Sequence, residues 1–244
     1  MKIYINEITG LGQAFESLLM SKRSWTREKA VELYELVYFS TFRDGMIRES
    51  EQIQFKTWMN KIIKYGVEYG HTTLLRFIDI SITVEGLHRY GQDDIDSHAA
   101  RMNNRIVRAS TRLGKFSDGE KSDYYKDKIM YPFEVLKGLG IEIPKSYIGE
   151  DGNTYVITDF GYVREDLKDV QDAKRGLYPG AIPSTFTFKV QYPEFCHIYQ
   201  HRNENSNANP EVKQCVEMIA DELRNWNIWL YENLNKLVME PGER

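Results

Sequence analysis

The sequence predicts an α+β protein in which helices surround a modest antiparallel sheet. Apolar residues recur at helical spacing in several long segments, whereas residues 76–86 (RFIDISITVEG) alternate between polar and apolar side chains, as a half-buried strand does. The chain has 244 residues, of which 41% are hydrophobic and 13% aromatic, so it can bury a substantial core. No repeat or low-complexity linker divides the sequence, and we therefore expect a single domain over residues 1–244.

The first half of the chain combines strand and helix patterns. Residues 1–8 (MKIYINEI) alternate like a short strand, and residues 27–41 and 51–65 each carry an apolar stripe at helical spacing. After the strand within residues 76–86 and a polar turn, residues 98–112 lack strand alternation. This last segment is therefore expected to be a helix, or a helix followed by a loop.

The middle of the chain predicts a helix and then a hairpin. Residues 119–138 have a helical pattern that ends at Gly138 or Gly140, and glycine suits a helix C-cap. Residues 146–163 (SYIGEDGNTYVITDFGYV) predict a β-hairpin that turns at Asp151-Gly152, a dipeptide typical of tight turns. We expect this hairpin to be an insertion into the domain.

The last part of the chain predicts one strand and two helices. Residues 182–192 (IPSTFTFKVQY) indicate a strand, which a short helix from about Glu194 to Arg202 follows. The final helix begins at residues 209–211 (NPE), which supply a capping residue, a proline at the first helical position and an acid in the first turn. Its apolar stripe continues to about Leu234.

Composition excludes several classes of protein. Lys and Arg number 32 and Asp and Glu 36, and the formal net charge of -4 argues against a globally basic nucleic-acid binder. Two cysteines, Cys196 and Cys215, are too few for a disulfide scaffold and fit a reducing cytosol. No run approaches the roughly 20 apolar residues of a membrane helix, and the N-terminus lacks a signal-peptide pattern. We expect a soluble cytoplasmic protein.

One segment is unusually basic. Between Asp96 and Asp118 the chain holds no acid, yet it carries five cations: Arg101, Arg105, Arg108, Arg112 and Lys115. If the segment is helical, the spacings place the four arginines on one face, where they repel one another. An anionic group is therefore expected to meet them.

Three kinds of anion could fill that role. Ion pairs within the chain would use the nearby acids Asp93, Asp94 and Asp96. A phosphate would suit the arginine fork, with the Ser110 hydroxyl as a further donor. Nucleic acid is the third alternative, which the net acidity disfavours.

No familiar catalytic motif accompanies this basic segment. The five histidines have no metal-ligand spacing, and there is no Cys-x-x-Cys, Gly-x-Ser-x-Gly, Walker loop or Gly-x-Gly-x-x-Gly. Cys196 and His197 are adjacent and would point to different sides of a helix, which disfavours a Cys-His nucleophile pair. Residue chemistry alone therefore predicts an anion-binding α+β protein and no particular reaction.

Separated blocks of the chain resemble the flavin-dependent thymidylate synthases. Residues 70–86 (GHTTLLRFIDISITVEG) resemble the family's Gly-His-x-Thr segment and following strand, and residues 108–112 (RASTR) resemble its Ser-x-Arg signature end. Residues 173–179 (AKRGLYP) resemble an Ala-Arg…Leu-Pro element, and residues 207–212 (NANPEV) a helix start. The blocks cover about half the chain and keep the family's order, with the family's final nucleotide arginine matched by Arg202.

The resemblance implies a specific fold, reaction and assembly. The fold would be flavin-dependent thymidylate synthase-like, and the chain would form a homotetramer with active sites at subunit interfaces. The enzyme would be a methyltransferase of nucleotide biosynthesis, a flavoprotein that transfers a one-carbon unit reductively from methylenetetrahydrofolate to C5 of dUMP. FAD would be the cofactor and NADPH the reductant.

The resemblance also assigns residues. Arg202 would face the pyrimidine carbonyl as the catalytic group, where a guanidinium stabilises negative charge developing on the ring. The nucleotide-binding positions would be Arg108, Ser110, Arg112, Arg175 and Arg202. The flavin-binding positions would be His71, Thr73, Arg101, Gln191 and His197.

This chain departs from the family on the flavin side. The Arg-His-Arg triplet falls on residues 100–102 (ARM), and Gln191, Pro193 and His197 stand where the family favours Asn, Arg and Asn. A second hypothesis is therefore a pyrimidine-nucleotide-binding paralogue that has lost flavin binding and catalysis. The sequence also leaves open dUMP or dCMP as the nucleotide, and a methyl or another C5 group such as hydroxymethyl in the product.

Overall fold

The computed structural model describes residues 1–21, 26–28, 31, 57, 60–62, 64–68, 71–99, 105–109, 120–170, 173, 176–204 and 207–236. Packing divides the chain into two compact units, each built from separated segments. The core unit comprises residues 3–83, 95–106 and 187–244, and the hairpin unit comprises residues 1–2, 84–94 and 107–186. The expectation of a single domain stays a prediction.

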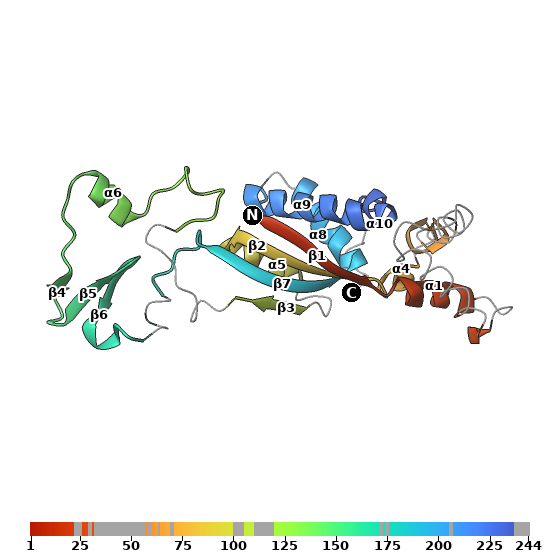
Figure 1. Ribbon diagram of the computed structural model, residues 1–244, viewed down its shortest axis with the longest axis horizontal. Coiled ribbons are helices and arrows are strands. Elements are labelled where there is room, and N and C mark those ends of the chain that lie inside the picture. The colour runs from red at the N-terminus through yellow and green to blue at the C-terminus, as the bar shows by residue number, and fades with distance from the viewer. Residues whose placement is uncertain are drawn as a thin grey trace. The chain divides into compact units, whose positions relative to one another are not determined.

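The main sheet has four strands in the order β1-β2-β7-β3 (Figure 1). Its strands are β1 (Lys2–Thr9), β2 (Asp79–His88), β3 (Arg105–Arg108) and β7 (Pro183–Gln191). The Tyr192 N–H donates to the Ile78 carbonyl at 2.8 Å, and the Thr83 and Thr187 hydroxyls hydrogen-bond at 2.9 Å. As the residue numbers rise along β2, the numbers of their partners in β7 fall, so the two strands are antiparallel.

The two central strands confirm the predicted alternation. In β2 every second residue is fully buried: Ile80, Ile82 and Val84. In β7, Phe186, Phe188 and Val190 are buried while Thr185, Thr187 and Lys189 are exposed. A period of two directs one face of each strand into the core.

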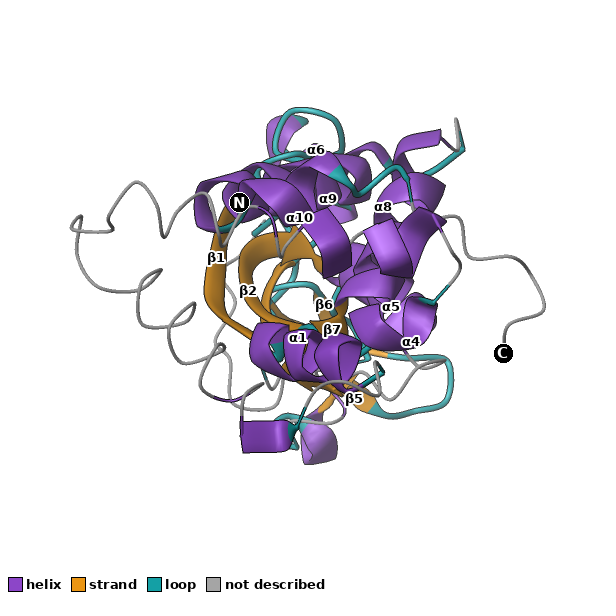
Figure 2. Cartoon of the chain, turned by 90° about the vertical axis from the view of Figure 1, so that its right-hand side faces the viewer, coloured by secondary structure: helices purple, strands orange, loops and turns teal. Residues whose placement is uncertain are grey.

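The helices α8 (Tyr192–Glu204), α9 (Pro210–Trp226) and α10 (Ile228–Glu232) lie together on one side of the strands of the core unit (Figure 2). Helix α9 begins as predicted, since Asn209 accepts a hydrogen bond from the Glu211 N–H at 2.9 Å and Pro210 follows it. Its buried stripe includes Val212, Cys215, Val216, Ile219 and Leu223. The core unit also contains α1 (Leu11–Met20), a π-helical turn (Lys64–Glu68) and α4 (Thr72–Leu75).

The prediction of one final helix reaching about Leu234 was wrong. Asn227 has φ -154° and ψ 97°, which ends α9, and its side chain caps α10. The Asn227 carbonyl oxygen of the side chain accepts from the Trp229 and Leu230 N–H groups at 3.1 and 3.2 Å. Asparagine is a strong N-cap, so it can interrupt an apolar stripe that otherwise continues.

The hairpin unit contains a second, three-stranded antiparallel sheet in the order β4-β5-β6. Its strands are β4 (Ser146–Ile148), β5 (Thr154–Thr158) and β6 (Gly161–Arg164), and a 3-10 turn (Glu165–Leu167) follows. The predicted hairpin at residues 146–163 is confirmed, with Gly152 at φ 76° in the turn. The sequence pattern did not separate β6 as a third strand.

The helix predicted at residues 119–138 is shorter in the structure. Among the described residues of this range, only α6 (Pro132–Gly138) is helical, and residues 120–130 form turns and coil. Pro132 explains the boundary, since the residue before a proline avoids helical angles. The predicted glycine C-cap is confirmed at Gly140, which has φ 70° and donates its N–H to the Lys137 carbonyl at 3.1 Å.

The predicted helix at residues 98–112 was also wrong in part. Helix α5 spans Arg89–Ala99, where a polar turn was expected, and residues 105–108 form strand β3. The Ala109 N–H donates to the Thr185 carbonyl at 2.8 Å, next to the end of this edge strand. A short edge strand with Ile and Val between arginines is hard to separate from a helix by periodicity.

Several expected features lie outside the described residues. They include most of the helices predicted at 27–41 and 51–65, and the side chains of Arg101, Arg105, Ser110, Arg112, Lys115 and Arg175. Among the helices that are described, none is both long enough and apolar enough to cross a bilayer.

Candidate functional site

Five of the predicted site residues lie on two neighbouring parts of the core unit. His71 and Thr73 are at the start of α4, Gln191 ends β7, and His197 and Arg202 lie on α8. Helix α4 packs against α8. Two blocks of sequence that carry the predicted site are therefore brought together by one helix contact.

At the start of α4, hydrogen bonds fix the backbone, while two side chains are accessible to solvent. The His71 N–H donates to the Tyr65 carbonyl at 3.2 Å, and the His71 carbonyl accepts from the Leu74 N–H at 3.1 Å. His71 occupies the N-cap position, but its side chain makes no capping hydrogen bond. The His71 and Thr73 side chains are exposed and, within the described part of the chain, make no hydrogen bond. Both are therefore available to a ligand.

Helix α8 is fastened to the C-terminal helices at both ends. The buried Tyr192 hydroxyl donates to the Leu230 carbonyl at 2.8 Å, and burial raises the pKa of this phenol well above its ordinary value. Near the other end, the Gln200 amide donates to the Leu234 carbonyl at 2.7 Å. The predicted helix from about Glu194 to Arg202 is confirmed, and its last turn is held in place.

The last turn of α8 gathers basic side chains. His197 and His201 are one turn apart and pack edge to face, with ring centroids 4.3 Å apart. Arg202 follows and is partly buried, near the helix C-terminus where a cation is favourable. His197 and Arg202 are five residues apart, so they project about 140° from each other around the helix. They would contact different parts of a ligand.

Cys196 supplies no nucleophile to this region. The Cys196 thiol is fully buried, and burial raises its pKa to about 12. His197, the next residue, is only partly buried on another side of the helix. A thiol that stays protonated at neutral pH and is closed to solvent does not act in covalent catalysis.

In the hairpin unit, Arg108 ends β3 and forms an ion pair with Asp93 of α5. Its side chain is 30% exposed. Because residues 105–108 form a strand, the expectation of a helix over this part of the basic segment was wrong. The internal ion pair, which was one of three open alternatives, is what the structure shows for Arg108.

Two buried polar residues of the hairpin unit were missed by the sequence analysis. Gln92 is 1% exposed, and its side-chain oxygen accepts from the Ser184 hydroxyl at 2.6 Å. The Gln92 amide nitrogen is buried and has no hydrogen-bond partner in the described part of the chain. His88 is 2% exposed and packs edge to face on Tyr125 at 5.1 Å. His88 ends β2 and Gln92 lies in α5, and no motif in the sequence marked either residue as buried.

The donors on α4 and α8 suit an oxygen-rich cofactor. Imidazole, hydroxyl and amide groups of His71, Thr73, Gln191 and His197 can donate to phosphate oxygens or to a ring carbonyl. Pro193 is buried in the first turn of α8 and has no donor. Within the described residues, no three His, Cys, Asp or Glu side chains cluster as metal ligands would.

Comparison with known proteins identifies the fold. Two crystal structures of the flavin-dependent thymidylate synthase ThyX from Helicobacter pylori with FAD and dUMP match the chain. The TM-scores are 0.56 and 0.57 at 12% sequence identity, and the matches cover 96% and 97% of this chain and 99% and 100% of the other. No family model and no curated protein sequence matches the chain. The chain therefore has the ThyX fold, as the resemblance predicted.

Proposed function

We propose that this chain, which has the fold of the flavin-dependent thymidylate synthases, transfers a one-carbon unit reductively to C5 of a pyrimidine nucleotide. The observation that carries the proposal is the packing of α4 on α8, which brings the His71 block and the Arg202 block together in the core unit. Both blocks were assigned to the site from sequence, far apart in the chain. The substrate would be dUMP or dCMP, methylenetetrahydrofolate the one-carbon donor and NADPH the reductant.

Arg202 is the group that we propose acts on the pyrimidine. A guanidinium against a ring carbonyl stabilises negative charge that develops on the ring, and it costs little reorganisation when its helix is already fixed. The hydrogen bonds of Tyr192 and Gln200 supply that fixation. Such a reaction needs no protein nucleophile, which agrees with the closed thiol of Cys196.

The remaining nucleotide contacts are proposed from the resemblance. Arg108, Ser110, Arg112 and Arg175 would hold the phosphate and the rest of the nucleotide through charge-assisted hydrogen bonds. Arg108 would exchange its internal partner Asp93 for the phosphate. This exchange exposes no charge, because both partners already reach solvent.

The FAD site would be built from His71, Thr73, Arg101, Gln191 and His197. The exposed side chains of His71 and Thr73, which make no hydrogen bond in the described part of the chain, support this assignment. When bound, FAD supplies the hydride that the transfer requires. We further propose a homotetramer in the cytoplasm, as the resemblance implies.

A second candidate is a nucleotide-binding paralogue that lacks FAD. The specific observation in its favour is Pro193, whose buried ring stands where the family favours an arginine. Proline cannot donate a hydrogen bond to a flavin phosphate. This protein would bind dUMP or dCMP and make no folate-dependent product.

The visible absorbance spectrum of the purified protein, with and without added FAD and dUMP, separates the two. A bound flavin spectrum that shifts on addition of dUMP supports the enzyme, and formation of a C5-modified nucleotide in the presence of methylenetetrahydrofolate and NADPH then tests the reaction. Absence of any flavin spectrum, together with calorimetric binding of dUMP or dCMP, supports the paralogue. Absence of both flavin and nucleotide binding contradicts both.

A further inference from the structure

A pocket of about 610 Å³ lies in the hairpin unit, between α6 and the end of β5. It is lined by Phe133, Glu134, Lys137, Gly138, Ile143, Ile157, Thr158 and Asp159. None of the residues proposed for the nucleotide or the flavin is among them. Its volume falls within the range of pockets that bind small molecules, about 300–1,000 Å³.

The walls of this pocket are held by specific contacts. Phe133 of α6 packs edge to face on Tyr162 of β6, with centroids 5.8 Å apart, and Tyr131 packs on Phe160 at 5.9 Å. The Glu134 carboxylate accepts from the Tyr131 N–H at 2.6 Å and from the Lys121 ammonium at 2.5 and 2.6 Å. These contacts fix the N-terminal turn of α6, with the Phe133 ring packed on β6.

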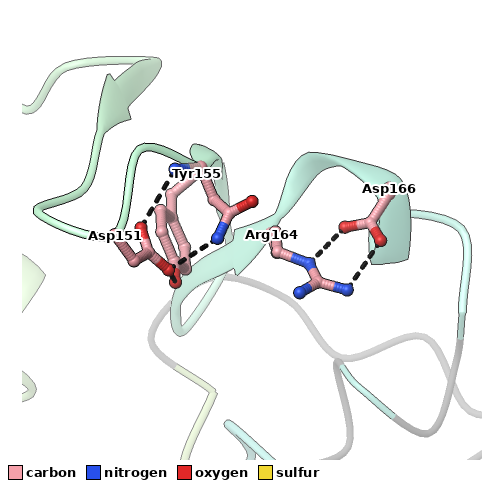
Figure 3. Close-up of polar contacts among 5 residues, drawn as sticks. Asp151, Tyr155, Arg164 and Asp166 are labelled. Atoms are coloured by element: carbon pink, nitrogen blue, oxygen red, sulfur yellow. Dashed lines mark hydrogen bonds and ion pairs between the residues drawn. The ribbon is translucent and has the colours of Figure 1, made fainter.

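Three charged side chains of the small sheet and its turns already have hydrogen-bond partners: Asp151, Arg164 and Asp166. Arg164 donates to both carboxylate oxygens of Asp166 at 2.5 and 2.7 Å (Figure 3). Asp151 accepts hydrogen bonds from the Asn153 side chain and backbone N–H and from the Tyr155 hydroxyl at 2.8 Å (Figure 3). These bonds, first those from Asn153, lower the pKa of the Asp151 carboxyl. These groups have little capacity left for a ligand.

Two charges that line the pocket differ in this respect. The side chains of Lys137 and Asp159 form no hydrogen bond or ion pair within the described part of the chain, with each other or with any other residue. Glu134, the third charge, is neutralised by Lys121. One cation and one anion thus border a space that the apolar side chains of Phe133, Ile143 and Ile157 also line.

We propose that this pocket binds a small zwitterion with an apolar, planar body. Its carboxylate would meet Lys137, its ammonium would meet Asp159, and its body would lie on Phe133, Ile143 and Ile157. Each charge contact would be charge-assisted, which makes it stronger than a contact between neutral groups. The pocket shares no residue with the proposed nucleotide site, and its ligand goes beyond the proposed reaction.

Three probes with one indole body test the charge requirement: L-tryptophan, tryptamine and indole-3-propionate. Calorimetry and amide chemical shifts of Gly138 and Asp159 are measured on the full chain. We expect L-tryptophan to bind about tenfold more tightly than either singly charged analogue. Lys137→Met should weaken L-tryptophan and indole-3-propionate but not tryptamine, and Asp159→Asn should weaken L-tryptophan and tryptamine but not indole-3-propionate.

Gly138→Leu provides the steric test. A Cβ at Gly138 meets no atom within 4 Å, so a side chain is sterically tolerated there. Because Gly138 lines the pocket, we expect leucine to reduce the space in it and to weaken binding of all three probes. Lys168→Met, at an exposed lysine that does not line the pocket, is the matched control and should change nothing. Absence of any shift with about 5 mM probe, equal affinity for the three probes, unchanged binding by Gly138→Leu, or displacement of the probe by dUMP would each overturn the proposal.

Discussion

The ammonium of Lys121 lies 2.5 and 2.6 Å from the two carboxylate oxygens of Glu134, and this ion pair fastens α6 in the hairpin unit. The Lys121 side chain is only 5% exposed and also lies over the ring of Tyr131, with 4.6 Å to the centroid. The surroundings raise the pKa of Tyr131 to about 12, first through burial and then through Glu134 and Glu120. A buried lysine depends on its one carboxylate partner.

Glu134→Gln should therefore destabilise the protein, because it leaves the buried ammonium of Lys121 without a counter-charge. We expect a loss of about 2 kcal/mol in the free energy of unfolding, measured by urea denaturation. Glu142→Gln, at an exposed carboxylate three residues beyond Leu139, is the control and should have little effect. A loss as small as that of the control would contradict the role of the ion pair.

The same ion pair predicts a dependence on pH. The pKa of Glu134 is lowered from its ordinary value of 4.5, first by the hydrogen bond from Lys121 and then by that from the Tyr131 N–H. Because folding lowers this pKa, the stability it contributes is present above the ordinary value and is lost as pH falls through the lowered value. The free energy of unfolding of the wild type should thus fall below about pH 4.5 more steeply than that of Glu134→Gln. Parallel profiles would exclude Glu134 as a source of the acid sensitivity.

Asp93 should compete with a nucleotide phosphate for Arg108. The side chains of Arg108 and Asp93 form an ion pair and are 30% and 47% exposed. A pair this exposed contributes about 0.5 kcal/mol to stability. If Arg108 binds the phosphate, Asp93→Asn should tighten dUMP binding about twofold to threefold, while Arg108→Gln should weaken it. Calorimetric titration with dUMP measures both variants. Weaker binding by Asp93→Asn would mean that the ion pair organises the site instead of competing with it.

Arg202→Lys tests the residue on which the proposed reaction depends. Lysine keeps the charge but loses the planar fork, so dUMP affinity should fall about tenfold, which is about 1.4 kcal/mol. Arg224→Lys is the matched control, because Arg224 also lies in the last turn of a helix and is exposed. Equal nucleotide affinity in the wild type and both variants would remove Arg202 from the site.

Sequence periodicity predicted the elements whose burial is regular. The alternation of polar and apolar residues in β2 and β7 and the Asn209-Pro210 start of α9 are local signals. The structure confirms each of them. Elements that depend on a single residue or on pairing across the sheet were not predictable in this way. Asn227 breaks a continuous apolar stripe by capping, and β3 is a strand because it pairs at the edge of the main sheet.

The site assignment stays a prediction, and the structure bears only on how the segments that carry it are arranged. The order of sequence blocks placed His71 and Arg202 in one site, and the contact between α4 and α8 agrees with that grouping. Periodicity could not reveal that Asp93 reaches Arg108, because the pair joins a helix to a strand fifteen positions away. The pocket of the hairpin unit was equally hidden, since it needs α6 and β5 to meet.

Alanine substitutions at Gly138 and Gly140 provide a matched comparison that tests the effect of backbone conformation on stability. A Cβ would meet no atom within 4 Å at either position, so alanine is sterically free of its neighbours at both. Gly140 has φ 70°, where alanine is strained by about 1 kcal/mol, whereas Gly138 ends α6 without a positive φ. Gly140→Ala should therefore lower the free energy of unfolding by about 1 kcal/mol, and Gly138→Ala should raise it by about 0.5 kcal/mol. Urea denaturation of both variants measures the difference, and equal effects would show that the left-handed turn after α6 contributes nothing to stability.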